Sequence, residues 1–470
     1  MRFPLLSKVV AIGLVVLLLM SVLMRIDGLV SERRWRQAQA TTGVEQSLAG
    51  AQTLVGPLLE RVCVEERDAP PAEGREPRKA PERRSYTLGA APATLQVAGD
   101  VRAEPRYRGL FKVNGYSGKL VLDAQWPSLA ALQPPPDMPG VRVRCGPVRV
   151  LLSVSDARGL RAAQLLLDGT ATAVRAGAGQ QRHVTGLHAE IDNARAAQAD
   201  RPLAVRATLD LLGTGRLGLV PAAGETAWSL RSDWPHPSFG GRFLPAAREV
   251  TEQGFSARWA VSALASAAGR DVFREVPACP ATVGGEEPDT AVAPTDRACL
   301  DTMGVAFVDP VNPYVLTDRA TKYALLFIVL TFGCVALTEV LAQRRVHPVQ
   351  YTLVGLALAL FYLLLLSLSE HVAFGAAYAA ASAACVGLLG VYARHMLGSR
   401  RAGAAFGAGV ALLYGALWTL LRLEQTALVI GSTLLFAVLA VVMWLTRRVD
   451  WYELFERLRQ PAARSHAASP

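Results

Sequence analysis

Four ionisable side chains near the ends of apolar segments are the residues best placed to do chemistry: Glu370, His371, Arg422 and Glu424. Ionisable groups are costly inside a bilayer, and where they occur there they mark substrate or ion pathways. Glu370 and Arg422 carry opposite charges and could pair across two helix ends. All four lie close to a segment end, however, where a long side chain reaches water. We therefore expect this polar cluster to have a structural or topological role, and the alternative is the external vestibule of a transporter.

Cysteines are the second group with possible chemistry, and the chain has six of them. Cys279 and Cys299 bracket a segment rich in Gly, Pro and Glu. In an oxidising compartment a disulfide would constrain this loop, and the alternative is two unpaired thiols. Cys334 and Cys385 lie within apolar runs, where cysteine acts as a small core residue. No C-x-x-C pair is present, which argues against a zinc ribbon or a thioredoxin-type site.

No sequence motif for catalysis or cofactor binding is present. The chain has no Walker loop, no G-x-S-x-G and no H-E-x-x-H, and its seven histidines are scattered. We therefore expect no metal, no cofactor and no enzymatic activity; a membrane-embedded protease would need paired catalytic motifs within the apolar segments. The net charge of +10 raises nucleic-acid binding as a hypothesis. No basic helix or RNA-binding aromatic motif supports it, so no nucleic-acid partner is expected.

Apolar segments show that the chain is an integral membrane protein, with the lipid bilayer as its first partner. Hydrophobic residues make up 51% of it, concentrated in the first 24 residues and the last third. The run Val9–Met24 follows Arg2 and Lys8 and has no small-x-small cleavage site directly after it, which predicts an uncleaved signal-anchor helix over residues 1–24. Five further runs, each long enough to cross a bilayer, predict a helical domain over 323–446 and a tail over 447–470. These runs are approximately Tyr323–Leu341, Tyr351–Leu368, Phe374–Tyr392, Gly403–Leu421 and Ala427–Thr446.

The arginines of the short loops predict the orientation. They follow the second, fourth and sixth predicted helices: Arg344 and Arg345, then Arg394, Arg400 and Arg401, then Arg447 and Arg448. By the positive-inside rule these loops are cytoplasmic, so both termini lie in the cytoplasm and residues 25–322 lie outside. A second arginine group, Arg25, Arg33, Arg34 and Arg36, lies on the predicted external side and conflicts with the rule. Long translocated domains escape the rule more readily than short loops do.

Residues 25–322 have the pattern of a mostly β domain. Apolar and polar residues alternate in Gly109–Trp126, Val141–Asp156 and Pro202–Val220, as in half-buried strands. Ser31–Val62 is predicted to be helical instead. After Asp309 the prolines predict an extended stretch and a helix that starts near Thr317, with Thr317 as its N-cap. The predicted fold is thus an α-helical bundle of about six transmembrane helices, with a mostly β domain inserted between helices one and two.

Longer motifs resemble those of the CreD family of bacterial inner-membrane proteins. They are SDWPHPSFGGRFLP (Ser232–Pro245), GFSARWAVSALA (Gly254–Ala265), YALLFIVLTF (Tyr323–Phe332), HPVQYTLVGLALALFYLLLLSLSEH (His347–His371) and TALVIGSTLLFAVLAVVMWLTRRVDWY near the end. LVGPLLERV (Leu54–Val62) matches more loosely. The resemblance implies a bacterial inner-membrane location and an output of an envelope-stress regulatory system, tied to colicin tolerance and envelope integrity. It implies no catalytic or ligand-binding residues.

The leading hypothesis is therefore a non-enzymatic inner-membrane protein whose periplasmic β domain, residues 25–322, engages an envelope component or an unidentified envelope protein. The alternative is a transporter or lipid-handling protein with a cavity among the five C-terminal helices.

Overall fold

A computed structural model describes residues 4–67, 82–135, 141–178, 185–274, 276–278, 299–309, 312–342, 346–423 and 427–447. The chain forms two compact units: Met1–Gln37 together with Val311–Pro470, and Ala38–Pro310. We call them the helical unit and the β unit. The sequence-based boundaries lie at residues 24 and 322 instead, because hydropathy marks where a chain enters lipid and not where its fold divides.

The first helix, α1, runs from Pro4 to Ser47 and so continues well beyond the apolar run. No proline lies between Met24 and Ser47, so nothing in that stretch forces the helix to stop. The predicted helix Ser31–Val62 is wrong in its second half, which belongs to strand β1 (Gln52–Arg67). From Leu54 to Glu60 every residue of β1 is buried. Such a continuous apolar run does not distinguish a strand from a buried helix.

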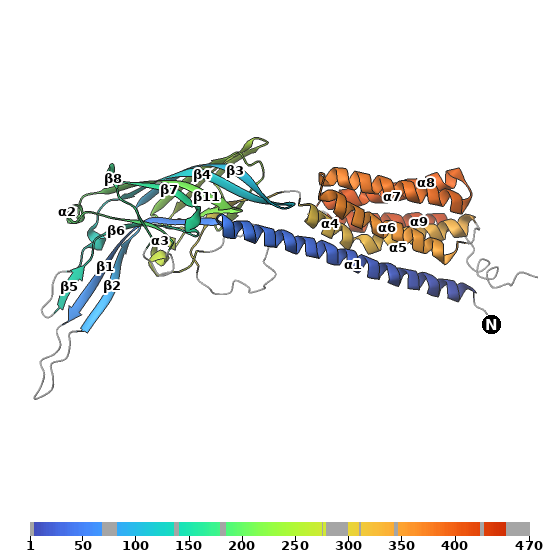
Figure 1. The fold of residues 1–470 in the computed structure, drawn as a ribbon, viewed down its shortest axis with the longest axis horizontal. Coiled ribbons are helices and arrows are strands. Elements are labelled where there is room, and N and C mark those ends of the chain that lie inside the picture. Colours follow the sequence, from blue (N-terminus) through green and yellow to red (C-terminus); the bar gives the residue numbers. More distant parts are fainter. Residues whose placement is uncertain are drawn as a thin grey trace, which may run out of the picture. The chain divides into compact units, whose positions relative to one another are not determined.

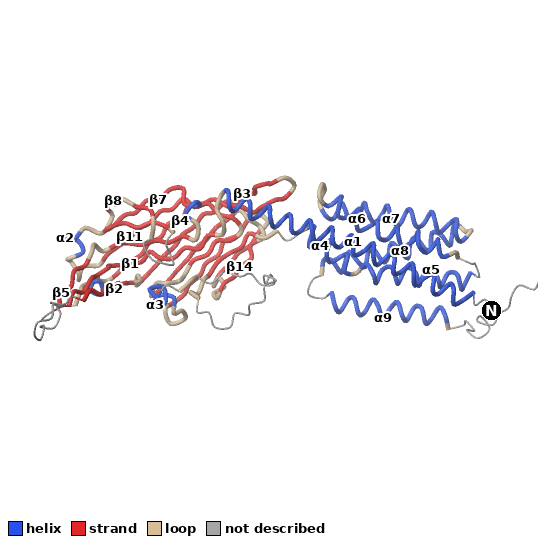
Figure 2. The backbone as a smooth tube through the Cα atoms, turned by 60° about the horizontal axis from the view of Figure 1, so that its bottom comes forward, coloured by secondary structure: helices blue, strands red, loops and turns tan. Residues whose placement is uncertain are grey.

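Two sheets form the β unit (Figures 1 and 2). The nine-stranded sheet has the order β14-β17-β12-β1-β6-β10-β9, with β2 and β5 also paired to β1. Besides β1 it contains β2 (Glu82–Ala90), β5 (Val141–Cys145), β6 (Arg149–Val154), β9 (Arg175–Ala176), β10 (Gly186–Glu190), β12 (Arg216–Leu219), β14 (Pro237–Gly241) and β17 (Met303–Phe307).

The eight-stranded sheet has the order β15-β16-β13-β3-β4-β11-β7-β8. Its strands are β3 (Thr94–Arg108), β4 (Phe111–Trp126), β7 (Leu160–Leu167), β8 (Thr170–Thr172), β11 (Leu203–Thr214), β13 (Glu225–Ser232), β15 (Ala247–Thr251) and β16 (Gly254–Ser262). The segments predicted as strands correspond to β4, to β5 with β6, and to β11 with β12. The prediction of a mostly β domain between the first and later helices is thus confirmed.

The core of the β unit lies between the two sheets. Trp228 and Trp259, from the eight-stranded sheet, stack at 4.5 Å between ring centroids and are fully buried. Leu54 and Val150, from the nine-stranded sheet, belong to the same apolar cluster. Two short helices, α2 (Asn193–Ala196) and α3 (Ala268–Asp271), complete the unit. Side chains alternate along each strand of the eight-stranded sheet. Because one face of this sheet packs against the nine-stranded sheet, the other face is exposed, and it carries a hollow described below.

Glycine and proline shape β1 within the segment Leu54–Val62. Gly56 has a φ of 100°, and the Gly56–Pro57 peptide bond is cis. The register with β6 shifts between Val55 and Leu58. A Cβ at Gly56 would lie 2.8 Å from the carbonyl oxygen of Leu151. The Gly-Pro pair thus forms a bulge at which only glycine is free of strain.

The helical unit contains α4 (Pro313–Lys322), α5 (Ala324–Ala342), α6 (Pro348–Ser369), α7 (Phe374–Leu397), α8 (Arg400–Arg422) and α9 (Ala427–Thr446), besides most of α1. Within the described residues, four helices are long and apolar enough to span a membrane: α1, α6, α7 and α8. The pair α4–α5, bent by 46°, would make a fifth. Every segment predicted to span is helical, so the prediction of about six helices holds approximately.

The N-caps of α4 and α6 account for two short sequence motifs. The predicted start at Thr317 is wrong: α4 begins at Pro313, and the side chain of its N-cap, Asn312, accepts a hydrogen bond from the Tyr314 N–H at 3.0 Å. Asn followed by Pro is itself a helix-start signal, and it precedes Thr317 in the chain. His347 caps α6 in a capping box with Gln350, which accounts for the HPVQ sequence.

Candidate functional site

The predicted polar cluster separates in the structure. Glu370 is the C-cap of α6, and its Oε1 lies 3.3 Å from Nε of Arg33 on α1. The Tyr314 hydroxyl hydrogen-bonds the same carboxylate. Arg422 instead lies over the Trp418 ring, 4.7 Å from its centroid. The Glu370–Arg422 pair considered from the sequence is therefore not formed, because α1 brings another arginine to Glu370.

A second ion cluster joins α1 to α4. The carboxylate of Asp318 is 11% exposed and lies 3.4 Å from Arg34 and 3.0 Å from Lys322. Gln37 lies one turn along α1 from Arg34, and its side chain accepts a hydrogen bond from Asn312 at 3.2 Å. Arg33 and Arg34, which conflict with the positive-inside rule, thus each have a carboxylate partner in the helical unit. We call Arg33, Arg34, Asp318 and Glu370 the helix-end network.

The other predicted site residues do not join this network. His371 is exposed in the turn after α6, where its N–H donates to the Leu368 carbonyl. Glu424 and Cys279 lie outside the described residues, so the predicted Cys279–Cys299 disulfide stays a prediction. Sequence reasoning missed the helix-end network because its two sides lie far apart in the sequence. The signal that could have found it was the discordant arginine group after the first apolar run.

Aromatic side chains fill the interface among α6, α7 and α8. Phe361 on α6 lies 5.6 Å from Tyr378 on α7 and 4.4 Å from Tyr414 on α8, between ring centroids. The hydroxyl of Tyr378 donates to the Tyr414 carbonyl at 2.6 Å, and that of Tyr414 donates to Sγ of Cys385 at 3.2 Å. All four side chains are buried. The three helices thus pack closely at these residues, and the two tyrosine hydroxyls are hydrogen-bonded within the interface.

A disulfide and a set of hydrogen bonds at the end of α1 stabilise the β unit internally. Cys63 on β1 and Cys145 on β5 are register partners and form a disulfide. It links the strands of the ribbon formed by β1, β2 and β5, which extends from the sandwich in Figure 1. The sequence indicated neither this pairing nor its register.

The hydrogen bonds at the end of α1 centre on Arg158 and Asp156. Arg158 donates to the carbonyl oxygens of Glu45, at 3.1 Å, and Gln46. Asp156 accepts from Arg158 and from the Gly50 N–H at 3.0 Å. The hydrogen bond from Arg158 lowers the pKa of Asp156 to about 2, and the Gly50 N–H acts in the same direction. A cation thus caps the last carbonyls of α1, as the helix dipole favours.

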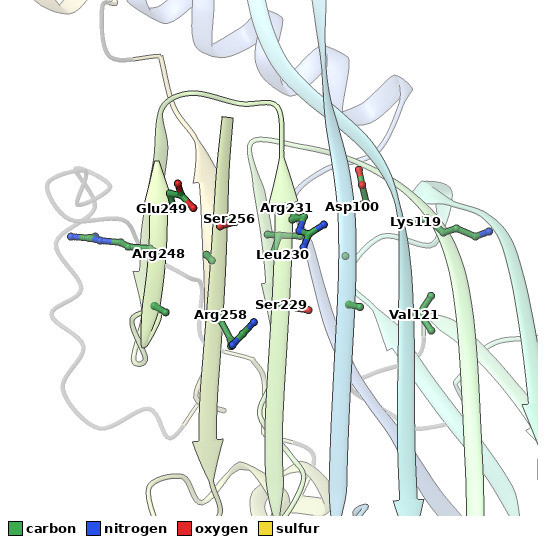
Figure 3. Close-up of a pocket in the computed structure, with 14 residues that line it drawn as sticks. Asp100, Lys119, Val121, Ser229, Leu230, Arg231, Arg248, Glu249, Ser256 and Arg258 are labelled. Atoms are coloured by element: carbon green, nitrogen blue, oxygen red, sulfur yellow. The ribbon is translucent and has the colours of Figure 1, made fainter. Parts of the chain in front are cut away.

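An open hollow of about 750 Å³ lies on the exposed face of the eight-stranded sheet (Figure 3). Strands β3, β4, β13, β15 and β16 line it. Its charged and hydroxyl-bearing residues include Asp100, Lys119, Ser229, Arg231, Glu249, Ser256 and Arg258. The hollow thus brings carboxylate and guanidinium groups together on one face of the sheet.

The helices and the inserted sandwich define a membrane-anchored protein with one large non-membrane β unit. The profile of a family described as "Inner membrane protein CreD" matches residues 4–452. Inner membrane protein CreD of Escherichia coli (strain K12) is 34% identical over 460 residues, which cover 96% of this chain and 95% of that protein. The chain therefore belongs to the CreD family, as its motifs predict, and is an inner membrane protein with several spanning helices.

Proposed function

We propose that this protein is a non-enzymatic component of the bacterial envelope whose β unit lies in the periplasm and engages an envelope component or partner protein. Through that contact it contributes to envelope integrity, the envelope-stress response and colicin tolerance. The Cys63–Cys145 disulfide is the observation that carries this proposal. Disulfides form and persist in the periplasm and are rare in the cytoplasm, which supports a translocated β unit.

The helix-end network gives a structural role to two of the arginines that conflict with this orientation. The positive-inside rule counts Lys and Arg and not net charge, so the arginines after the first apolar run still oppose it; they precede a long domain, which escapes the rule more readily than a short loop does. Arg33 and Arg34 are paired with Glu370 and Asp318, which offsets their charge on the external side. The Arg-rich loops after α5, α7 and α9 then set the orientation, with both termini in the cytoplasm.

The packing of α6, α7 and α8 favours an anchor over the alternative of a transporter. A conduit needs polar groups that face water or substrate within the bilayer. At this interface the hydroxyls of Tyr378 and Tyr414 are used by neighbouring helices instead.

Cysteine labelling tests the orientation. In a chain whose Cys279, Cys299, Cys334 and Cys385 are replaced by serine and whose Cys63–Cys145 disulfide is kept, Leu264, fully exposed after β16, and Arg400, at the start of α8, give a matched pair of single-thiol sites. With a membrane-impermeant maleimide on intact spheroplasts, Leu264→Cys should be labelled, and Arg400→Cys only after permeabilisation. The reverse pattern would place the β unit in the cytoplasm and end the proposal.

Complementation tests the cellular role. The chain should restore colicin tolerance to an Escherichia coli strain that lacks its own CreD, with the empty vector as control and immunoblotting to match membrane levels. Absence of restoration at normal membrane levels would contradict the role. Turnover of an envelope glycan or lipid by the purified chain would contradict its non-enzymatic character.

A further inference from the structure

Two arginines and two serines form a square on the exposed face of the eight-stranded sheet. On the paired strands β13 and β16, Arg231 is opposite Ser256 and Arg258 is opposite Ser229. The alternating residues Leu230, Ala257 and Trp259 point into the core and are buried. Arg231 and Arg258 are thus diagonal neighbours across the strand pair, a spacing that long side chains can bridge. Figure 3 shows both at the hollow.

The two guanidinium groups are available to a ligand. Among the described residues, neither Arg231 nor Arg258 has a carboxylate oxygen within 4.0 Å. Arg206, on the same face of the sheet, is held by Asp123 with Nε–Oδ1 at 2.5 Å and Nη2–Oδ2 at 3.2 Å. Unlike the guanidinium group of Arg206, those of Arg231 and Arg258 are therefore not neutralised by an ion pair with a described residue.

The hollow is part of an elongated trough. Two smaller hollows, of about 460 Å³ and 220 Å³, lie along the strands on either side; Arg231 lines the first and Arg258 the second. Ala98 on β3 presents only a methyl group to the hollow. A trough that runs along the strands and is open to solvent suits a linear ligand better than a compact one.

The charged side chains that line the hollow indicate which functional groups its ligand carries. Guanidinium groups donate paired hydrogen bonds to carboxylate or phosphate. Asp100 and Glu249 line the same hollow and only accept hydrogen bonds when ionised, so they would repel a ligand that carried anions alone. A linear ligand with both oxyanions and hydroxyl donors satisfies both groups.

We propose that this trough binds an acidic glycan, a carboxylate-bearing polysaccharide strand, through Arg231 and Arg258. The proposal specifies the envelope component of the proposed function and rests on it for its cellular meaning. Binding by the purified chain tests the site without any cellular phenotype, so either proposal can fail alone.

The experiment is calorimetric titration of the full chain in neutral detergent at low ionic strength. The probes are an oligogalacturonate, a maltooligosaccharide of equal length and glycerol phosphate. The double variant Arg231→Gln/Arg258→Gln should weaken oligogalacturonate binding at least about tenfold, since one charged hydrogen bond contributes that much. Arg175→Gln is the matched control and should bind like the unmodified chain, because Arg175 is an exposed arginine on β9 of the other sheet, 3.8 Å from Glu190. Circular dichroism confirms that each variant is folded.

The neutral maltooligosaccharide should bind more weakly than oligogalacturonate. Equal oligogalacturonate affinity in the double variant, or no binding to the unmodified chain at millimolar concentration, would overturn the proposal. Preference for glycerol phosphate would also overturn it and would indicate a lipid headgroup site instead.

Discussion

Arg33 on α1 and Glu370 at the end of α6 form an ion pair with Nε–Oε1 at 3.3 Å, and the Glu370 side chain is only 9% exposed. The pair joins the first and third predicted spanning helices, which lie far apart in the sequence. Removal of one partner leaves the other charge poorly solvated. The pair therefore matters more to the fold than an exposed ion pair does.

Arg33→Gln should lower the stability of the helical unit by about 1–3 kcal/mol, because it leaves Glu370 unpaired. The exchange Arg33→Glu with Glu370→Arg should recover much of the loss. Thermal unfolding of the purified chain in detergent measures both. Arg36→Gln is the control, since Arg36 pairs with Glu32 at an exposed site, with side chains 50% and 48% exposed. Equal effects of Arg33→Gln and Arg36→Gln would contradict a special role for the Arg33–Glu370 pair.

Gly403 allows α7 and α8 to approach each other. A Cβ there would lie 2.7 Å from Cα and 2.8 Å from N of Arg394, both backbone atoms that cannot turn aside. Gly403→Ala should therefore destabilise the helical unit by about 1–3 kcal/mol, the usual range for overpacking. Gly409→Ala, on the same helix with nothing within 4 Å, should have little effect. Detergent thermal unfolding compares the two, and indistinguishable shifts would refute the close approach.

Loss of the Cys63–Cys145 disulfide should destabilise the β unit. The bridge joins residues 82 apart in sequence, for which the chain-entropy model gives about 4 kcal/mol. Cys63→Ser/Cys145→Ser should lower the urea midpoint followed by tryptophan fluorescence. Cys334→Ser, which removes a free thiol from α5, is the control. If reductant lowers the midpoint of the double variant as much as that of the unmodified chain, the disulfide does not account for the stability.

Asp156 should make the β unit sensitive to acid. Its pKa is lowered from 3.8 to about 2 in the fold, so it contributes stability above pH 3.8 that is lost as the pH falls toward 2. Solvent screening reduces this contribution to about 1 kcal/mol. The unfolding free energies of the unmodified chain and of Asp156→Asn should differ by a constant amount at neutral pH and converge in acid. Urea titrations at several pH values measure this; a difference independent of pH would show that the charge of Asp156 is not what stabilises the end of α1.

Hydropathy and alternation were sufficient to determine the class of fold, and the longer motifs indicated the family. Spanning helices and strands follow from the local pattern of apolar residues, so α6, α7 and β4 lie where the sequence predicts them. The same local signals fail where one pattern suits two structures. Leu54–Glu60, buried throughout, forms a strand where a helix was predicted, and Asn312 caps a helix that was expected to start at Thr317.

Pairings between distant residues were decided by the tertiary structure alone. Cys63 meets Cys145 because β1 and β5 share a register, and Glu370 meets Arg33 because α1 passes the end of α6. The square of Arg231, Arg258, Ser229 and Ser256 likewise depends on the pairing of β13 with β16. The alternation pattern in the sequence often predicts whether each of these side chains is exposed. Only the folded chain determines which of them meet, because strand register and helix packing are set by contacts that no local pattern contains.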